Sequence, residues 1–439
     1  MPYVYFGVHP RVPTSFFRLE DPVSYDILKN LLKTQMESAE RRERRQISQM
    51  NAILDYAVKR IPYYTAKYKN QKLNIYSIKD FTRLPELSKS EFKANNEAIL
   101  SRDFNKNQVK VLYTSGSTGI PVKIHLSKEF LHWKKALLLR HYYRMGYRVG
   151  DRSAVLWGSP RYLKAKRIWE KIENFFMNVR EMRTFKITER DMRDYAAFLE
   201  RFKPKVMETY VSATLLLGEV VQKYGYKVEP KAIQTASEVL LPNKRKYIED
   251  VFSCEVFDRY GANEVGPIAG ECITHESMHI DSESVYVEIN EKGEMLITNL
   301  LNYAMPLIRY NIGDINKMDG KEHNCGLTLP SMGHLSGRSN DLIKTTSGDF
   351  VDSYFFMALM DSIPGIKKFK VVQNRNLSID IFIVRGEGYD QERAELTIGN
   401  TLMRMDSNAK SIIRYENEVH GEESGKFRYV ISKADTTWR

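Results

Sequence analysis

The first long pattern in the chain is helical. Between residues 22 and 60, apolar side chains recur every three or four positions and charged side chains fill the positions between them, as on a helix with one buried face. The pattern stops at the segment RIPYY (60–64), since proline disfavours helix at the residue before it. We therefore predict helical structure up to Arg60. The apolar positions are Ile27, Leu31, Leu32, Ile47, Met50, Ile53, Leu54 and Ala57.

Between residues 105 and 258, short apolar segments alternate with longer helical ones. Such alternation predicts a mostly parallel sheet with helices on its faces. Ligands bind at the carboxyl ends of the strands in sheets of this kind, so we expect binding loops there. The strand-like segments are AVLWGS (154–159), KVMETY (205–210), KAIQTA (231–236) and CEVFDRY (254–260).

The pattern changes after residue 284. Segments up to residue 318 predict paired strands, and the region after Gly337 predicts a hairpin, a helix and two further strands. We therefore expect an α/β protein with two domains. Residues 1–336 would form a large N-terminal domain with mostly parallel sheets flanked by helices plus a small β-subdomain, and residues 337–439 a small α+β C-terminal domain.

Charge and composition narrow the class of protein. The 439 residues include 67 Lys+Arg against 55 Asp+Glu, a formal net charge of +12. The basic residues are spread along the chain without a nucleic-acid-binding signature, so attraction of small anionic substrates, or of an anionic membrane face, explains the charge better. No apolar run reaches the roughly 18 to 20 residues of a membrane span, and the first residues lack the features of a secretory signal. With only three cysteines a disulfide framework is not expected, and we predict a cytoplasmic protein that binds no nucleic acid.

The segment YTSGSTGIPVK (113–123) is rich in glycine and hydroxyl side chains. It does not fit a P-loop, because Gly116 and Gly119 are too close together and a strand, not a helix, is predicted from Val122. Glycines nevertheless let backbone amides converge on an anion, and hydroxyl groups donate hydrogen bonds to phosphate oxygens. The segment therefore predicts a phosphate-binding loop, with a polar hairpin turn as the alternative.

This loop resembles the phosphate-binding signature of the adenylate-forming enzymes, the superfamily of acyl-CoA synthetases, luciferases and the adenylation domains of peptide synthetases. Three later segments resemble further motifs of that superfamily in the same order. They are YGANEVG (260–266) for its adenine and magnesium motif, RYNIGD (309–314) for its ribose motif, and GRSNDLIKTTSGDFV (337–351) for the junction with its small, mobile C-terminal domain.

The segment IPYYTAKY (61–68) and the cysteine and histidine that follow the adenine motif resemble one branch of the superfamily. This branch contains the phenylacetate–CoA ligases and related capsular-polysaccharide biosynthesis proteins. The resemblance implies attack of a carboxylate on the α-phosphate of ATP, which gives acyl-AMP and pyrophosphate. Because both reacting groups are anionic, positioning and electrostatic stabilisation would carry the catalysis.

The resemblance assigns the terminal phosphates of ATP to the hydroxyl loop. Lys123 would add positive charge there, unless it is only a solvated strand residue. Lys426, in ESGKFRYVISK (423–433), resembles the C-terminal Gly-Lys motif and would stabilise charge on the α-phosphate, although a lysine between polar residues is otherwise simply solvated. The loop residues are Ser115, Gly116, Ser117, Thr118 and Gly119.

The adenine motif implies that Tyr260 stacks on the base, that Gly261 allows close approach and that Glu264 binds Mg²⁺, which prefers hard oxygen ligands beside phosphates. The alternative for Tyr260 is an ordinary core aromatic. The segment TASEVL (235–240) resembles the stretch that contacts adenine and acyl group in the family. Its weaker candidates are Ala236, Ser237 and Glu238.

The ribose motif implies that Asp314 accepts hydrogen bonds from both ribose hydroxyls. Arg338 would hold the same ribose or the phosphate. The residue two positions later is the hinge in the family, usually Asp or Lys, and here it is Asn340. A hinge needs only to tolerate a change in φ and ψ, so the substitution does not forbid domain rotation.

Cysteine and histidine form two short clusters, which favour structural Zn²⁺ because soft sulfur and imidazole are its usual ligands. Some members of the resembled branch hold zinc with a cysteine and histidine here and a Cys-x-Cys pair downstream, the first of which is replaced by histidine in this chain. The alternative is buried apolar thiols with surface histidines. The expected ligands are Cys272, His279, His323 and Cys325, with His275 as the substitute for His279.

The sequence thus favours ATP-dependent activation of a small carboxylic acid and transfer to an acyl acceptor, preferably coenzyme A. Transfer to an amine or sugar in surface polysaccharide biosynthesis is the close alternative. Two alternative functions belong to other classes. They are a nucleotide-binding module without catalysis and a basic RNA-binding protein. The abundant aromatics, 26 Tyr, 20 Phe and 4 Trp, are compatible with an aryl acid. The resemblance also implies a homodimer.

Overall fold

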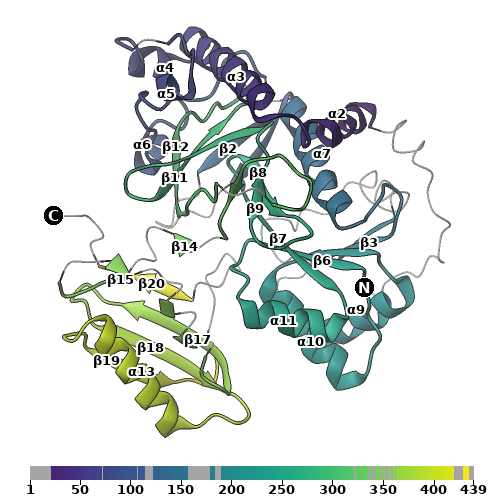
Figure 1. The fold of residues 1–439 in the computed structure, drawn as a ribbon, viewed down its shortest axis with the longest axis vertical. Helices are drawn as coiled ribbons and strands as arrows, with labels where there is room; N and C mark the ends of the chain where they lie inside the picture. Colours follow the sequence, from purple (N-terminus) through teal and green to yellow (C-terminus); the bar gives the residue numbers. More distant parts are fainter. Residues whose placement is uncertain are drawn as a thin grey trace. The chain divides into compact units, whose positions relative to one another are not determined.

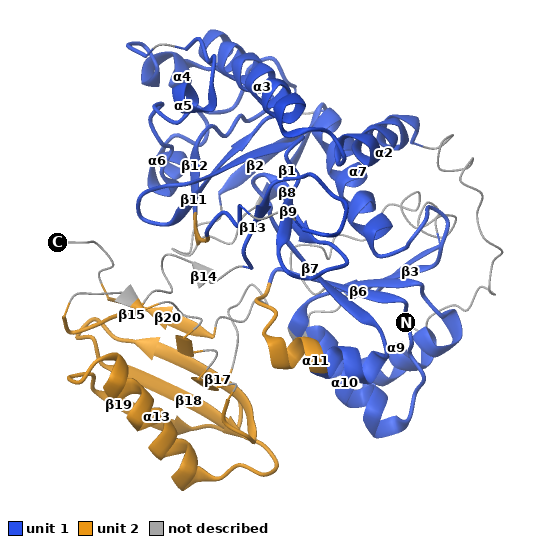
Figure 2. Cartoon of the chain, in the orientation of Figure 1, with its two compact units in different colours: residues 1–237, 247–312, 317–334 blue, residues 238–246, 313–316, 335–439 orange. Residues whose placement is uncertain are grey.

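The computed structural model describes most of the chain (Figure 1). The chain divides into two compact units, residues 1–237, 247–312 and 317–334 in one and 238–246, 313–316 and 335–439 in the other (Figure 2). The boundary at residues 336 and 337 stays a prediction. The described residues are 21–71, 73–105, 107–113, 122–156, 178–182, 189–320, 323–334, 337–338, 343–347, 350–351, 355–356, 359–360, 362–419 and 429–434.

The N-terminal helical pattern is confirmed, as two helices rather than one. The side chain of Asp21 accepts a hydrogen bond from the Ser24 amide, and Ser38 does the same for Arg41, so each helix has an N-cap. Pro62 begins the next helix, where its missing N–H leaves no hydrogen bond unmade. The helices are α2 (Pro22–Thr34), α3 (Ala39–Arg60), α4 (Pro62–Lys67), α5 (Ile78–Phe81) and α6 (Lys89–Ala94).

In the described part of the chain the largest sheet has eight strands, in the order β13-β9-β8-β7-β6-β5-β3-β4. The pairs from β4 to β7 are parallel and those from β7 to β13 are antiparallel. The predicted parallel core is therefore confirmed. Its strands are β3 (Ser153–Leu156), β4 (Val179–Met182), β5 (Val206–Thr209), β6 (Ala232–Ala236) and β7 (Glu255–Ala262), and the antiparallel extension comprises β8 (Gly266–Glu271), β9 (Met278–Ile280) and β13 (Ser331–Met332).

Helices cover this sheet. Helix α7 (Lys128–Arg144) presents Leu139, Tyr142 and Tyr143 to an apolar row of the sheet, which consists of Val206, Ala232 and Phe257. Two helices, α9 (Glu189–Phe202) and α10 (Val211–Tyr224), pack against each other (Figure 1). The helix that follows β6 is α11 (Pro242–Phe252). Helix α2 in turn packs Leu28 and Leu31 against α7.

Two smaller sheets complete this part of the fold. The hydroxyl segment lies between the antiparallel strands β1 (Val109–Tyr113) and β2 (Lys123–Ser127), as its flanks predict. The second sheet has the order β10-β11-β12-β14 and confirms the paired strands predicted after residue 284. Its strands are β10 (Val285–Ile289), β11 (Glu294–Asn299), β12 (Tyr310–Ile315) and β14 (Gly337–Arg338).

The second unit contains a four-stranded sheet of order β19-β18-β17-β20 with helix α13 (Gln391–Met405) packed on it. Ala394, Ile398 and Leu402 form the buried side of that helix. The predicted hairpin, helix and two strands are therefore all present. The strands are β17 (Ile366–Gln373), β18 (Ile379–Arg385), β19 (Ser411–Tyr415) and β20 (Val430–Ser432), with the short pair β15 (Ile343–Lys344) and β16 (Phe350–Val351).

None of the helices in the described ranges combines the length and the apolar character that a membrane span requires.

Candidate active site and cysteine–histidine cluster

The hairpin of β1 and β2 holds the ends of the hydroxyl loop together. Tyr113 and Lys123 are register partners, so the loop leaves and re-enters the structure at adjacent backbone positions. The Lys123 side chain is exposed, and its backbone carbonyl accepts a hydrogen bond from Asn96 at 2.9 Å. The five loop residues predicted to hold phosphate, from Ser115 to Gly119, lie outside the described residues.

Strand β6 ends in an unusual backbone conformation. Ala236 is buried at the carboxyl end of the strand, and the next residue, the exposed Ser237, has a φ of 69°. Non-glycine residues seldom adopt this left-handed region, and such strain is concentrated at binding sites. The conformation therefore supports a binding role for the end of β6, where sheets of this kind place their ligands.

The hairpin between β7 and β8 carries the predicted adenine and magnesium residues. Tyr260 is buried on β7, and its register partner on β8 is Ala269. Glu264 lies in the turn of the hairpin, partly exposed, with no ion pair among the described residues. A carboxylate in a turn that forms no ion pair with the described residues is available as a hard ligand for Mg²⁺.

Gly261 is required by the hairpin itself. A β-bulge shifts the register between Tyr260 and Gly261. A Cβ at Gly261 would lie 2.8 Å from the carbonyl oxygen of Gly266 and 3.2 Å from Cα of Pro267. Close approach of backbone to backbone is thus one reason for glycine here, in addition to the close approach of a ligand that the motif implies.

The two predicted ribose residues lie on neighbouring strands, and both residues belong to the second unit. Asp314 on β12 and Arg338 on β14 are antiparallel register partners, so their backbone positions are adjacent. Asp314 is buried. Glu238, the last residue of the TASE segment, is partly buried and belongs to the same unit. Lys426 and Asn340 lie outside the described residues.

A row of polar side chains crosses the central strands next to the apolar row described above. It consists of Glu208 on β5, Gln234 on β6 and Arg259 on β7, and we call it the polar row. Arg259 donates to Glu208 at 2.6 Å and to Gln234 at 3.2 Å. The hydroxyl of Tyr142, on α7, donates to the other oxygen of Glu208 at 2.5 Å. Our sequence interpretation missed this row, although polar residues at alternate positions of otherwise apolar strands are a visible signal.

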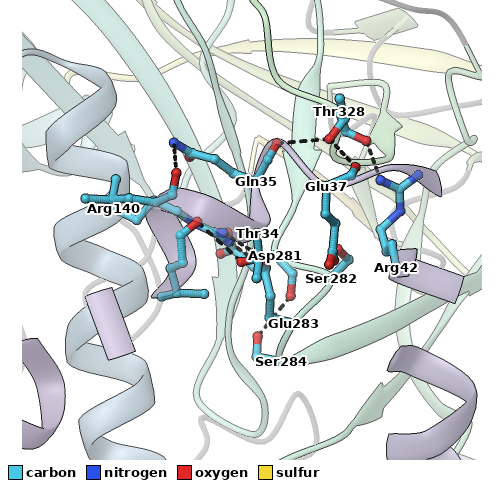
Figure 3. Close-up of polar contacts among 12 residues, drawn as sticks. Thr34, Gln35, Glu37, Arg42, Arg140, Asp281, Ser282, Glu283, Ser284 and Thr328 are labelled. Carbon is cyan, nitrogen blue, oxygen red and sulfur yellow. Dashed lines mark hydrogen bonds and ion pairs between the residues drawn. The ribbon is translucent and has the colours of Figure 1, made fainter. Parts of the chain in front are cut away.

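Helix α7 is anchored by buried charges (Figure 3). Arg140 donates to both oxygens of Glu283, at 2.7 and 3.0 Å, and to Asp281 at 2.6 Å. Thr34, at the end of α2, also donates to Glu283, and His141 lies 2.8 Å from the second oxygen of Asp281. Burial alone would raise the pKa of the Asp281 carboxyl, but His141 and Arg140 bring it well below its usual range. The cluster therefore fixes the position of α7 over the sheet.

Three of the predicted metal ligands meet in one place. One ligand atom each of Cys272, His279 and Cys325 lies within 4.8 Å of the others. His279 and Cys272 are buried, and Cys325 Sγ is 3.2 Å from His279 Nε2. The other ring nitrogen of His279 lies 3.3 Å from the carbonyl of Leu329, the arrangement that usually orients a metal-binding imidazole. Burial opposes ionisation of the Cys272 thiol, but hydrogen bonding to His279 and Thr274 lowers its pKa to about 6, which favours the thiolate that zinc requires.

The remaining two histidines are engaged elsewhere. The ring nitrogens of His323 lie 2.8 Å from Ser277 Oγ and 3.0 Å from Glu276, although its ring centroid is 5.5 Å from that of His279. His275 lies 2.9 Å from Glu271 and packs against Phe257. His323 as the fourth ligand therefore stays a prediction, and His279 rather than His275 joins the two cysteines.

Metal analysis would test this cluster. We expect close to one zinc per chain in protein purified without chelator, because two thiolates and an oriented imidazole form a typical zinc donor set. The variants Cys272→Ser and Cys325→Ser should lose the metal, whereas Cys254→Ser, which removes the third free cysteine, should retain it. A zinc content near zero in the unaltered protein would reject the site. His323→Ala would then show whether the fourth position belongs to histidine.

The chain is similar to two groups of known proteins, CapK and the phenylacetate-coenzyme A ligases. A family model described as the CapK C-terminal domain matches residues 343–433. Protein CapK of Staphylococcus aureus is 21% identical over 392 residues, which cover 86% of each chain. Phenylacetate-coenzyme A ligase of Pseudomonas putida is 20% identical over 417 residues, 89% of this chain and 92% of that protein.

Solved structures share the fold over almost the whole length. A 2-hydroxyisobutyryl-CoA ligase in the postadenylation state, in complex with R3-HIB-AMP, has a TM-score of 0.75 at 17% identity and covers 91% of this chain and 92% of its own. The same ligase in complex with 2-HIB-AMP and CoA has a TM-score of 0.64. The α/β fold that the motifs implied is thereby confirmed.

Proposed function

We propose that this chain, a relative of CapK and of the phenylacetate–coenzyme A ligases that has the fold of the adenylate-forming enzymes, is an AMP-forming acid ligase. The carboxylate of a small acid attacks the α-phosphate of ATP, the bond between the α- and β-phosphates breaks, and acyl-AMP and pyrophosphate result. The observation that carries the proposal is the β7–β8 hairpin. It places Tyr260 and Glu264 at the carboxyl end of the parallel strands, where this class of sheet binds ligands.

The residues of this hairpin fit ATP and Mg²⁺. Tyr260 offers an aromatic ring for the base, and the carboxylate of Glu264 offers a hard oxygen ligand. Bound Mg²⁺ supplies positive charge that offsets the repulsion between carboxylate and phosphate. The loop from Ser115 to Gly119 would donate hydrogen bonds to the released phosphates, with Lys123 adding charge from β2. In the second unit, Asp314 and Arg338 would hold the ribose and Lys426 the α-phosphate.

Coenzyme A is the acceptor that we favour. The phenylacetate-coenzyme A ligase of Pseudomonas putida aligns with 89% of this chain, and the structural neighbours include a ligase in complex with an acyl-adenylate and CoA. The thiol of coenzyme A would displace AMP from the acyl-adenylate to form a thioester. The chain would then act as an acyl-CoA synthetase.

A role in surface polysaccharide biosynthesis is the second candidate. It is favoured by the match of residues 343–433 to the CapK C-terminal domain and by the alignment with CapK itself. In that case an amine or a hydroxyl of a sugar would attack the acyl-adenylate in place of the thiol. Homodimer formation stays a prediction under either acceptor.

The test is carboxylate-dependent exchange of labelled pyrophosphate into ATP over arylacetic, benzoic, fatty, amino, uronic and dicarboxylic acids. Exchange with at least one acid, followed by thioester formation when coenzyme A is added, is the expected result. Exchange without thioester formation would favour the amine or sugar acceptor. ATP binding without exchange for any acid would favour a nucleotide-binding module without catalysis and would overturn the proposal.

A further inference from the structure

We infer that the polar row and Lys134 of α7 select an acid that carries a second anionic group, such as a dicarboxylic acid, at the end remote from the reacting carboxylate. This inference rests on the proposed function, because it concerns the acid that the same site would adenylate. It goes beyond that function by naming the substrate class. All residues that carry it belong to the first compact unit.

The first argument comes from the unused hydrogen-bonding groups of the row. Both oxygens of Glu208 and the side-chain oxygen of Gln234 already accept hydrogen bonds. Arg259 uses Nε and Nη2 for these bonds, and its Nη1 has no acceptor within the described ranges. The ammonium group of Lys134 likewise has no hydrogen bond or ion pair with a described residue. The polar row and Lys134 therefore offer unused hydrogen-bond donors, whereas the acceptors named above are occupied. A ligand that supplies acceptors suits this arrangement.

The second argument comes from charge. Among the described residues, Lys134, Arg259 and Lys110 bring three positive charges to a place where Glu208 supplies one negative charge. Burial, together with the like charges of Arg259 and Lys110, lowers the pKa of the Lys134 amine to about 8. A partly buried ammonium that forms no ion pair with a described residue is unfavourable for the folded protein, and groups perturbed in this way are concentrated at functional sites. An anionic group on the ligand would supply the missing charge.

The third argument comes from position. The polar row is nearer the carboxyl ends of the parallel strands than the apolar row of Val206, Ala232 and Phe257. Lys134 lies beside the β7–β8 hairpin, because a Cβ at Gly266 would be 3.9 Å from its Cδ. That hairpin also carries Glu264. An acid with its reacting carboxylate at the nucleotide can therefore direct its remote end toward the row.

An apolar acid fits this arrangement less well. A phenyl or alkyl group packed on Lys134 and Arg259 would exclude water and leave their donors unpaired, at the full cost of their desolvation. When a site is built to hydrogen-bond a substrate group, it rejects the analogue without that group strongly. An apolar pocket discriminates far less against a substrate that lacks one methylene. The row therefore predicts discrimination against arylacetic and fatty acids.

The test compares matched acids that differ only in the remote group: glutarate with pentanoate, and 4-carboxyphenylacetate with phenylacetate. Glucuronate serves as a hydroxylated acid without a second carboxylate. In pyrophosphate exchange, we expect kcat/KM for each dicarboxylic acid to exceed that of its partner by about 10⁴-fold, as for a site built to hydrogen-bond the group that the partner lacks. The variant Lys134→Met should remove most of this preference. The control Lys128→Met, an exposed lysine at the start of the same helix, should preserve it.

A binding measurement keeps the inference separate from the proposed function. Glutarate with ATP should raise the melting temperature of the unaltered protein more than pentanoate with ATP does, and Lys134→Met should abolish the difference. Without ligand, Lys134→Met should melt at the same temperature or higher, because an uncompensated charge is removed. Absence of exchange with every acid would overturn the proposed function. Equal or stronger exchange and stabilisation by the acids without a second anionic group, or an unchanged preference in Lys134→Met, would overturn this inference alone.

Discussion

Replacing Glu264 by glutamine is expected to lower carboxylate-dependent pyrophosphate exchange by about 10² to 10³-fold, the range found when one preorganised electrostatic group is removed from an active site. Glutamine keeps the size of the side chain and its place in the hairpin turn, but it loses the negative charge that would hold Mg²⁺ beside the phosphates. The melting temperature should change little, because Glu264 is partly exposed and has no ion pair within the described residues.

The measurement is the exchange rate as a function of Mg²⁺ concentration. Raising Mg²⁺ should restore part of the activity of Glu264→Gln, because the loss is one of metal affinity. A matched control is Glu291→Gln, which alters an exposed glutamate in the turn between β10 and β11 and should leave exchange unchanged. Full activity of Glu264→Gln at low Mg²⁺ would remove this residue from the magnesium site.

Replacing Arg140 by methionine is expected to destabilise the protein by about 3 to 5 kcal/mol, the usual effect of removing one partner from a buried ion pair. The side chains of Arg140 and Asp281 are fully buried and that of Glu283 is 2% exposed. Methionine would leave the two carboxylates without the guanidinium that compensates them. Calorimetry should show a lower melting temperature than for the control Arg41→Met, which alters an exposed arginine on α3.

The pH dependence of the melting temperature of Arg140→Met identifies the cause of its destabilisation. Contacts with Arg140 help to lower the pKa values of Asp281 and Glu283 against the opposing effect of burial. In the unaltered protein these two carboxylates therefore stabilise the folded state above about pH 4, the pKa of such groups in the unfolded chain. That stabilisation is lost as the pH falls through their lower pKa values in the folded protein. In Arg140→Met the carboxyl groups can become protonated, so the difference in melting temperature should be largest near neutral pH and shrink below about pH 4. A difference that is independent of pH would point to lost packing instead.

The buried charge cluster and the polar row meet on one helix. Arg140 and His141 anchor the second half of α7, whereas Lys134 lies toward its first half and Tyr142 contacts Glu208 near its end. The helix is thereby held from α2 and from the turn at Asp281 to Ser284. The position of Lys134 over the sheet follows from this anchoring, which explains why charges are buried at a place that is remote from the proposed chemistry.

Local patterns determined most of the elements of this protein. Proline ended the first helical region at the predicted residue, Arg60, and the alternation of apolar segments predicted β5, β6 and β7 and the hairpin of β17 and β18. These features depend on neighbours within a few residues, so the sequence contains the necessary information. Strand β8 was missed because GPIAGE has a low strand propensity, and only its two neighbours in the sheet stabilise it there.

The candidate sites also divide into residues that the sequence could identify and contacts that only the tertiary structure decided. Tyr260, Glu264 and Asp314 could be named from motifs, and Cys272, His279 and Cys325 from their ligand chemistry, because these properties belong to residue types at short spacing. Only the tertiary structure decided which histidine joins the two cysteines. It also decided that one row under Lys134 contains Glu208, Gln234 and Arg259. Strand register and helix packing bring together residues that are up to 125 positions apart in the chain, as Lys134 and Arg259 are, and no local pattern encodes such a distance.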